Sequence, residues 1–163
     1  HLAHSIIVHG LAKAYSMTGW RIGFLAAPKP IAQAINALQS HSTSNATSFA
    51  QKGAVAALTG PQTHLEEWLT EFNKRRTYAA ERLNNMSGIS CVNSRGAFYL
   101  FPNIEGTGLT SAEFCDRLLV HSKVAAVPGI AFGADNNFRI SYATSMENIQ
   151  KGMDRLDAFC KSL

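Results

Sequence analysis

The sequence contains no apolar run that approaches the roughly 20 residues of a membrane-spanning helix. It also begins without the basic segment and following apolar stretch of a targeting peptide. Cysteine is scarce, because the chain has 3, namely Cys91, Cys115 and Cys160, and no Cys-x-x-Cys pair. This number and spacing exclude a disulfide framework and a zinc site, and predict buried free thiols in a reducing compartment. We expect no membrane contact, no metal and a cytoplasmic location. An organelle stroma or matrix stays open, since a targeting segment would lie upstream of this chain.

Clustered basic charge is also missing. The 15 basic and 11 acidic residues are scattered along the chain, and the one basic run, Lys74-Arg75-Arg76, falls inside a helical pattern. A nucleic-acid surface needs basic residues gathered on one face with interleaved aromatics. We therefore expect the run to be a solvated helix face and expect no nucleic-acid partner. The 46% apolar content predicts a globular chain with a core.

One glycine-punctuated stretch, Gly10–Gly23, carries a lysine and an arginine on either side of a loop. Lys13 follows an apolar run, and Arg21 precedes the next one. Burial where a strand gives way to a loop would favour the neutral amine of Lys13, which can form a Schiff base with an aldehyde cofactor. Arg21 could then hold that cofactor's phosphate. The residues alone also allow both to be solvated surface charges.

A second arginine, Arg139, stands among the apolar residues Phe138, Ile140 and Tyr142 of a predicted strand. An arginine in such a strand is either an exposed residue of the polar face, a buried ion-pair partner, or a binding group. Its planar donor fork can make two parallel hydrogen bonds to one carboxylate, which fixes the orientation of the bound acid. The residues alone leave these alternatives open.

The full order of Gly10–Gly23 resembles the lysine signature of the fold-type I, class I aminotransferases, which carry pyridoxal 5'-phosphate (PLP). The segment Arg139–Thr144, Arg-Ile-Ser-Tyr-Ala-Thr, resembles the family segment whose arginine binds the substrate α-carboxylate. The resemblance implies that Lys13 forms the Schiff base with PLP and shuttles a proton. It also implies that Arg21 holds the cofactor phosphate and Arg139 binds the substrate.

Two positions depart from many members of that family, which carry serines where this chain has Gly10 and Ala12. Two side-chain hydroxyls are therefore absent. The resemblance then implies that the backbone N–H of Gly10 and the guanidinium of Arg21 take a larger share of phosphate binding.

Three further segments resemble parts of the family near its active site. Gly96–Tyr99 and Val127–Gly133 resemble small-domain segments that line the substrate entrance, although each could equally be a hairpin turn and a strand end. The polar stretch Ser42–Asn45 resembles a region that approaches the partner subunit's active site, with a solvated loop as the alternative. The resemblance implies a homodimer.

Periodicity predicts the following elements: a buried strand of a parallel sheet at 6–8, a strand at 20–27, helices at 30–40, 46–58 and 61–86, a strand pair at 89–92 and 97–101, a helix at 110–121, strands at 123–127 and 138–142, and a terminal helix. Capping boxes of Thr110 with Glu113 and of Thr144 with Glu147 predict the starts of the last two helices.

These elements and the resemblance imply an α/β fold, the C-terminal part of a fold-type I PLP-transferase. Residues 1–60 would form the C-terminal part of the large PLP-binding domain, with the end of its sheet and helices. Residues 61–88 would form a long interdomain helix, and residues 89–163 a small C-terminal α+β domain. Because the chain opens one strand before Lys13, we expect a C-terminal piece of a longer polypeptide.

The resemblance implies transamination between an amino acid and a 2-oxo acid. The branch most similar is the bacterial and plastid aspartate or prephenate aminotransferases, which favours aspartate and 2-oxoglutarate. We expect this chain alone to bind PLP poorly and not to turn over, because the family's groups on the pyridine nitrogen and phenolic oxygen lie upstream of His1. Two alternatives stay open: a PLP-dependent β-lyase, and a non-catalytic aminotransferase-like module that senses a ligand in a transcription regulator.

Overall fold

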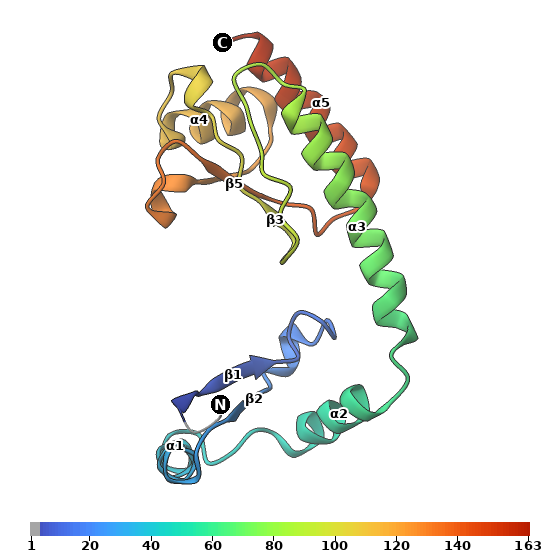
Figure 1. Cartoon of the computed structure of the whole chain (residues 1–163), viewed down its shortest axis with the longest axis vertical. Helices are drawn as coiled ribbons and strands as arrows, with labels where there is room; N and C mark the ends of the chain where they lie inside the picture. Colours follow the sequence, from blue (N-terminus) through green and yellow to red (C-terminus); the bar gives the residue numbers. More distant parts are fainter. Residues whose placement is uncertain (1–3) are drawn as a thin grey trace. The chain divides into compact units, whose positions relative to one another are not determined.

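The computed structural model describes residues 4–163. It divides the chain into two compact units, His1–Glu67 (unit 1) and Trp68–Leu163 (unit 2) (Figure 1). None of the helices formed by residues 4–163 combines the length and apolar character that a membrane crossing requires. The domain limits expected from the sequence, 1–60, 61–88 and 89–163, stay a prediction.

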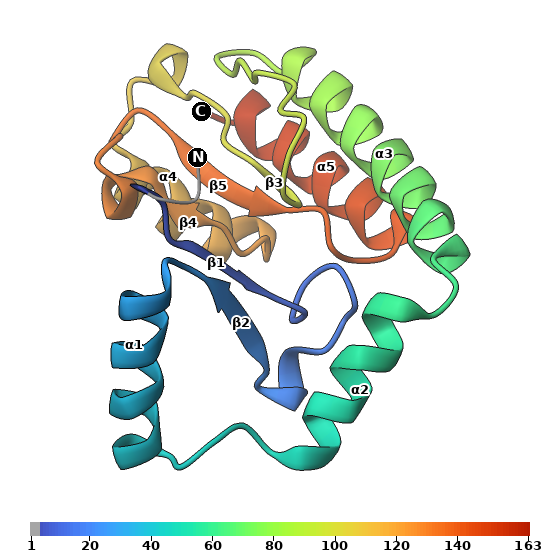
Figure 2. The same ribbon diagram turned by 60° about the horizontal axis from the view of Figure 1, so that its bottom comes forward.

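Unit 1 is built on a pair of strands and two helices. In chain order these are β1 (Ile7–Gly10), the 3-10 turn η2 (Thr18–Trp20), β2 (Gly23–Ala26), α1 (Lys29–Ser42) and α2 (Ser48–Thr59). The strands pair antiparallel, with Ile7 opposite Ala26 and Gly10 opposite Gly23. Figure 2 shows them side by side, flanked by α1 and α2. The segment that carries Lys13 and Arg21 therefore leaves and re-enters this sheet at one end.

The prediction of a buried parallel strand at 6–8 is wrong. The side chains of Ile6, Ile7 and Val8 are 52%, 49% and 78% exposed. Among residues 4–163, β2 is the one strand that pairs with β1, and it runs antiparallel. A pair of strands has no further layers to cover it, so the apolar run lacks the burial that a parallel sheet provides.

The second strand is shorter than the sequence predicts. It begins at Gly23 rather than at position 20, because Trp20 closes the turn η2 and Arg21 adopts a left-handed conformation with φ 51°. A left-handed residue reverses the chain direction locally and cannot continue a strand. The start of the predicted strand thus belongs to the loop between β1 and β2.

The two helices of unit 1 confirm the sequence prediction within a few residues. Pro30 lies in the first turn of α1, where its missing N–H leaves no helical hydrogen bond unmade. None of the residues of α1 is buried, whereas α2 buries Ala50 and Ala54. Gly60 ends α2, and a Cβ there would lie 2.7 Å from the carbonyl oxygen of Ala56.

The long helix α3 (Thr63–Asn84) begins in unit 1 and continues into unit 2, and it confirms the helix predicted over 61–86. The remaining elements are β3 (Tyr99–Leu100), η3 (Glu105–Thr107), α4 (Ser111–Arg117), the π-helical turn η4 (Leu118–Ser122), β4 (Val127–Pro128), η5 (Gly129–Phe132), β5 (Phe138–Ser141) and α5 (Met146–Lys161). The strand order is β3-β5-β4, and β5 runs antiparallel to both neighbours.

The predicted pairing of 89–92 with 97–101 is wrong. Tyr99 and Leu100 pair with β5, and the earlier segment keeps only an isolated bridge between Ser90 and Asn103. The amide of Asn84, at the end of α3, both accepts from the backbone N–H of Cys91 and donates to its carbonyl, each at 2.9 Å. A side chain therefore takes the place of a neighbouring strand. The strand predicted at 123–127 is reduced to β4, which pairs Val127 with Arg139 and Pro128 with Phe138.

The core of unit 2 lies between the sheet and helices α3, α4 and α5. Phe114 of α4 packs against Phe138 of β5 and Phe159 of α5, with ring centroids 5.0 and 5.3 Å apart. Leu156 and Leu83 are fully buried in the same cluster. Figures 1 and 2 show α3 and α5 side by side, as the shared cluster requires.

The three cysteines are free thiols, as predicted. Cys115 and Cys160 are buried in the core of unit 2, and burial raises the pKa of both thiols to about 11. Cys91 is half-buried rather than buried, and burial also raises its thiol pKa. Thiols in this state stay protonated near neutral pH and are poor nucleophiles.

Of the two predicted capping boxes, one is confirmed and one is wrong. Thr110 and Glu113 cap α4 reciprocally, and the Thr110 hydroxyl bond holds the pKa of the Glu113 carboxyl below its ordinary value. α5 instead begins after Ser145, whose hydroxyl accepts from the backbone N–H of Asn148 at 3.2 Å. The cap is thus one residue later than Thr144, which accepts from the Asn148 side chain.

Candidate active site

Lys13 lies in a tight turn directly after β1. The turn is closed by two backbone hydrogen bonds, from Tyr15 to the carbonyl of Leu11 and from Ser16 to the carbonyl of Lys13, at 3.3 and 3.1 Å. Ser16 adopts a left-handed conformation with φ 53°, which turns the chain back toward η2. The predicted burial of Lys13 is wrong for this chain, because its side chain is exposed. The turn fixes the backbone of the lysine and leaves its side chain exposed.

The turn is anchored on α2 by a small apolar cluster. Leu11 and Met17, on either side of Lys13, are 1% and 7% exposed and pack with Ala54. The cluster joins the loop to one face of α2, where Ala57 also packs against it. The lysine is therefore held between two buried anchors.

Aromatic contacts extend this anchorage. Trp20 lies over Gly53 of α2, where an added Cβ would be 2.6 Å from the indole ring, and it contacts the ring of Phe49 edge-on at 6.1 Å. The hydroxyl of Tyr15 donates to Gln62 at 3.0 Å. The small alanine and glycine residues of α2 thus leave room for the loop to pack on this helix.

Arg21 stands at the other end of the loop, just before β2. Its guanidinium donates to the carbonyl of Thr18 at 2.9 Å, which orients it within the turn while its side chain stays exposed. Gly23, which follows, is required by close approach of the strands, because a Cβ there would lie 2.9 Å from the carbonyl oxygen of His9. A glycine therefore allows β1 and β2 to pair up to the point where the arginine leaves the sheet.

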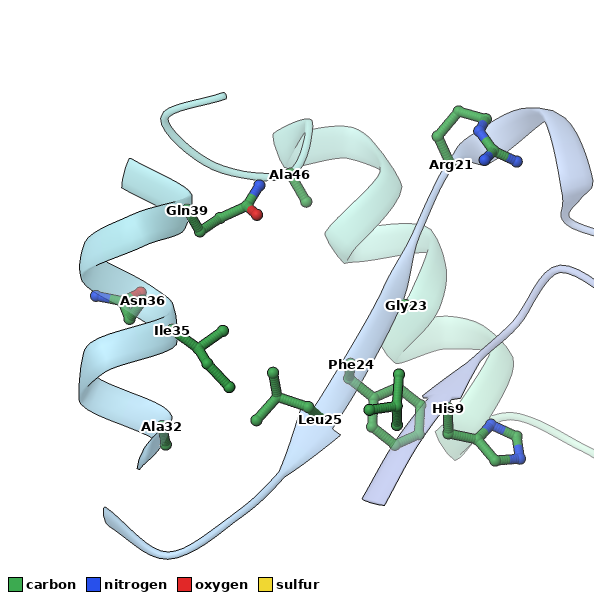
Figure 3. Close-up of a pocket in the computed structure, with 11 residues that line it drawn as sticks. His9, Arg21, Gly23, Phe24, Leu25, Ala32, Ile35, Asn36, Gln39 and Ala46 are labelled. Carbon is green, nitrogen blue, oxygen red and sulfur yellow. The ribbon is translucent and has the colours of Figure 1, made fainter. Parts of the chain in front are cut away.

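A groove of about 570 Å³ runs beside β2, and Arg21 lies at one end of it (Figure 3). Leu25 of β2 and Ile35 of α1 extend toward each other across it, and Gln39 adds an amide near the opposite rim. His9 and Phe24 stack with ring centroids 5.5 Å apart on the strand side. Lys13 is not among the residues that line this groove.

Unit 1 thus brings a primary amine and a guanidinium into one loop, and these groups suit an aldehyde that also bears a phosphate. Gly10 lies in β1 opposite Gly23, where a Cβ would meet only ordinary contacts of 3.5 Å and more. Packing does not demand a glycine at position 10, so a serine would also fit there. The donor set of Lys13, Arg21 and the Gly10 backbone can therefore accommodate PLP. Among residues 4–163, no group of histidine, cysteine or acidic side chains could hold a metal ion.

Arg139, the third candidate, belongs to unit 2 and lies in the central strand β5. Its neighbours Phe138 and Ile140 are buried in the core, so the half-buried Arg139 occupies the opposite face of the sheet. The central carbon of its guanidinium lies 4.4 Å from the ring centroid of Tyr99 and 4.6 Å from that of Phe132. Among residues 4–163, no carboxylate forms a salt bridge with Arg139, so the ion-pair alternative does not apply within this chain.

Sequence reasoning missed the two rings. It placed Gly96–Tyr99 and Val127–Gly133 near the substrate entrance without assigning a role to either aromatic residue. The available signal was one aromatic side chain in each glycine-containing loop, but register decides which side each ring faces. The third segment, Ser42–Asn45, is an exposed end of α1 and the loop that follows.

Comparisons with known proteins agree with this geometry. The family model described as "Aminotransferase class I and II" matches residues 2–156. The chain is 44% identical to the aspartate aminotransferase of Geobacillus stearothermophilus and 43% identical to the aspartate/prephenate aminotransferase of Cereibacter sphaeroides, over 98% of this chain in each case. Both alignments cover 42% of the relative.

Solved structures give the same result. The crystal structure of the Rhizobium meliloti aspartate aminotransferase matches 98% of this chain with a TM-score of 0.95 at 38% identity. That of the aromatic aminotransferase from Pyrococcus horikoshii matches 99% with a TM-score of 0.94 at 38% identity. The chain spans less than half of each of these proteins, 42% and 44%. The chain therefore belongs to the class I and II aminotransferase family, whose class I enzymes work with pyridoxal 5'-phosphate.

Proposed function

We propose that this chain is the C-terminal part of a PLP-dependent aminotransferase that moves an amino group between aspartate and 2-oxoglutarate. The observation that carries the proposal is the Gly10–Gly23 loop, which carries Lys13 and Arg21 and is anchored to α2 by Leu11 and Met17. The family match over residues 2–156 supports it.

Each candidate residue has a distinct task in this proposal. Arg21 and the backbone N–H of Gly10 would hold the cofactor phosphate, and the amine of Lys13 would hold the cofactor aldehyde. When bound, PLP supplies the electron-withdrawing ring that makes the substrate Cα proton acidic. The amine of Lys13, once the substrate's amine has displaced it from the cofactor aldehyde, would take that proton and return it. Arg139 binds the α-carboxylate with its planar donor fork.

The amino donor is proposed from relatives and not from a pocket in this chain. Relatives named aspartate and aspartate/prephenate aminotransferases favour aspartate. Similar structures include an aromatic aminotransferase, with a TM-score of 0.94, and an alanine aminotransferase, with a TM-score of 0.89, so the common scaffold accepts different side chains. Rates with aspartate, alanine, phenylalanine and prephenate as partners, measured on the full-length protein, test the donor, and a preference for neutral donors overturns it.

The assembly and location are further parts of the proposal. We infer a homodimer, because the family builds its active sites at the subunit boundary, and a cytoplasmic or organelle-interior location. Light scattering on the full-length protein tests the dimer, and a monomeric active enzyme overturns it.

Borohydride reduction of the PLP-loaded full-length protein tests the central assignment. Peptide mapping is expected to find the reduced cofactor on Lys13, with Lys29 and Lys52 of the same unit as internal controls. Lys13→Ala is expected to lower transamination by about a thousandfold or more, through loss of the general base and the covalent link. A label on another lysine contradicts the proposal.

The 163-residue chain alone provides a second test. We expect it to bind PLP weakly and to produce no oxo acid from aspartate, because unit 1 leaves the side chain of Lys13 exposed. A cofactor absorbance band with turnover would contradict this. In the full-length protein, pyruvate and ammonia released from cystathionine without an acceptor would instead identify a β-lyase, and an upstream DNA-binding segment without turnover would identify a sensor module.

A further inference from the structure

Two aromatic rings contact the guanidinium of Arg139 from two different segments of unit 2. Tyr99 is on β3, opposite Ser141 of β5, so it is the diagonal neighbour of Arg139 on the same face of the sheet. Phe132 is at the end of η5, which directly follows β4. The guanidinium carbon lies 4.4 Å from one ring centroid and 4.6 Å from the other. We call Tyr99 and Phe132 the aromatic clamp.

The clamp differs from the environments of two other arginines of unit 2, Arg82 and Arg75. Arg82 also lies over a ring, that of Tyr78 at 5.8 Å, but it donates to Asp154 at 2.7 Å. Arg75 is paired with Glu71 at 2.9 Å. For Arg139, within residues 4–163, the contacts are the two rings, and no carboxylate or carbonyl accepts from its guanidinium. A half-buried arginine without an acceptor of its own is suited to an acceptor that comes from a ligand.

We propose that Tyr99 and Phe132 are positioning residues that fix the plane of the Arg139 guanidinium for a carboxylate. This inference rests on the proposed function of Arg139. Rings use the flat faces of a guanidinium and leave its N–H groups, which all lie in the plane, available to an anion. A fixed plane favours the two parallel bonds to a planar carboxylate over the single bonds that other anions make.

The structure holds the Phe132 side of the clamp firmly. The backbone N–H of Gly129 donates to Asn137 at 2.8 Å, and that of Ala134 donates to Gly129 at 3.0 Å, so η5 is tied to the start of β5. At Gly129 a Cβ would lie 2.1 Å from the carbonyl oxygen of Ala134, which leaves no room for another residue. Phe101 packs edge-on against Phe132 with centroids 5.8 Å apart. These bonds fix the backbone of η5, and the contact with Phe101 places the Phe132 ring, which is 49% exposed, beside Arg139.

The buried hydroxyl of Ser111 adds a polar brace beneath the same turn. It donates to the carboxylate of Asp135 at 2.6 Å and accepts from the backbone N–H of Ile130 at 3.1 Å. The N-terminal end of α4 thus supports η5 and, through it, Phe132.

The test replaces each ring by an aliphatic residue in the PLP-loaded full-length protein. Tyr99→Leu and Phe132→Leu are expected to raise the KM for aspartate and the dissociation constant of succinate, a non-reacting dicarboxylate, by about fivefold to tenfold each. kcat changes less than about threefold. Tyr99→Phe, which keeps the ring, restores the affinity. Tyr78→Leu, which removes the ring from Arg82, serves as the matched control and leaves both constants unchanged.

Two further measurements separate the possible results. β-Alanine, which is aspartate without its α-carboxylate, is expected to react equally in the wild type and the clamp variants. Arg139→Gln is expected to raise the KM for aspartate more than either ring variant does.

Each contrary result has a defined meaning. If the clamp variants bind succinate as tightly as the wild type while Arg139→Gln binds it more weakly, the clamp is overturned and the proposed function stays intact. If Arg139→Gln binds succinate as tightly as the wild type, both the clamp and the proposed function of Arg139 are overturned. An equal loss of aspartate and β-alanine reactivity in the clamp variants identifies a general structural role and overturns the positioning role.

Discussion

Unit 1 and unit 2 differ in how much of their apolar surface they bury. Helices α3, α4 and α5 of unit 2 close one continuous core over the sheet, with Phe114, Phe138 and Leu156 fully buried. In unit 1 the buried cluster consists of a loop packed on α2, while α1 buries none of its residues. The candidate catalytic loop therefore belongs to the unit with the smaller core. Local anchors, rather than a thick core, fix its geometry.

The difference also separates the two kinds of candidate site. Lys13 stands in a turn that ends at the left-handed Ser16, and Arg21 is itself left-handed, so backbone geometry positions them. Arg139 stands in a central strand, and two rings from neighbouring segments position its side chain. A turn fixes the position of a residue's backbone, whereas side-chain packing fixes the position of its functional group.

The largest expected effect tests the core of unit 2. Phe114→Ala removes a fully buried ring that packs on two other aromatic rings, and it is expected to lower the free energy of unfolding by about 3–5 kcal/mol. The matched substitution in unit 1, Leu38→Ala, changes a side chain that is 70% exposed and is expected to shift stability by less than about 0.5 kcal/mol. Urea unfolding of the 163-residue chain measures both. Equal losses of unfolding free energy in the two variants would contradict the difference in burial between the units.

Hydrogen exchange tests the same contrast without a substitution. Amides of α5, which buries Ile149, Met153 and Leu156, are expected to exchange at least about a hundredfold more slowly than those of α1. Opening of α1 exposes little apolar surface that is not already in water. Mass spectrometry of peptides covering the two helices provides the measurement. If the amides of α1 were as well protected as those of α5, α1 would be stabilised in solution by contacts that unit 1 does not contain.

A smaller effect is expected from the brace under η5. Ser111→Ala leaves the backbone N–H of Ile130 without its acceptor and is expected to lower the free energy of unfolding by about 1–3 kcal/mol. In the full-length protein the same variant should also raise the KM for aspartate, because Phe132 loses support. Ser122→Ala, at the end of η4, is the control. A loss of stability without any change in KM would separate the brace from the clamp.

The smallest effect compares one glycine in a helix of each unit. Nothing lies within 4 Å of a Cβ at Gly152 of α5, so Gly152→Ala should stabilise unit 2 by about 0.5–1 kcal/mol through helix propensity. At Gly53 of α2 the same change meets the ring of Trp20 and should cancel that gain. Tryptophan fluorescence should shift in Gly53→Ala only. A shift in both would show that the loop and α2 do not depend on this contact.

Much of the architecture followed from local patterns. The helices α1, α2, α3 and α5 and the cap at Thr110 were predicted to within a few residues, because helical periodicity, proline and glycine positions and capping pairs act over one or two turns. The strands were predicted less well. The pairing of β3 with β5 depends on segments about forty residues apart, which no local pattern specifies.

The sequence by itself determined the loop chemistry and the family: the order of residues from Gly10 to Gly23 and the arginine in Arg139–Thr144 were readable without coordinates. Only the tertiary structure decided that β1 is antiparallel and exposed, that Lys13 is uncovered in this chain, and that Tyr99 and Phe132 contact Arg139. Residue types and spacing fix which chemical groups are present. Burial and orientation depend on which distant segments come to lie against them, and that is a property of the folded chain as a whole.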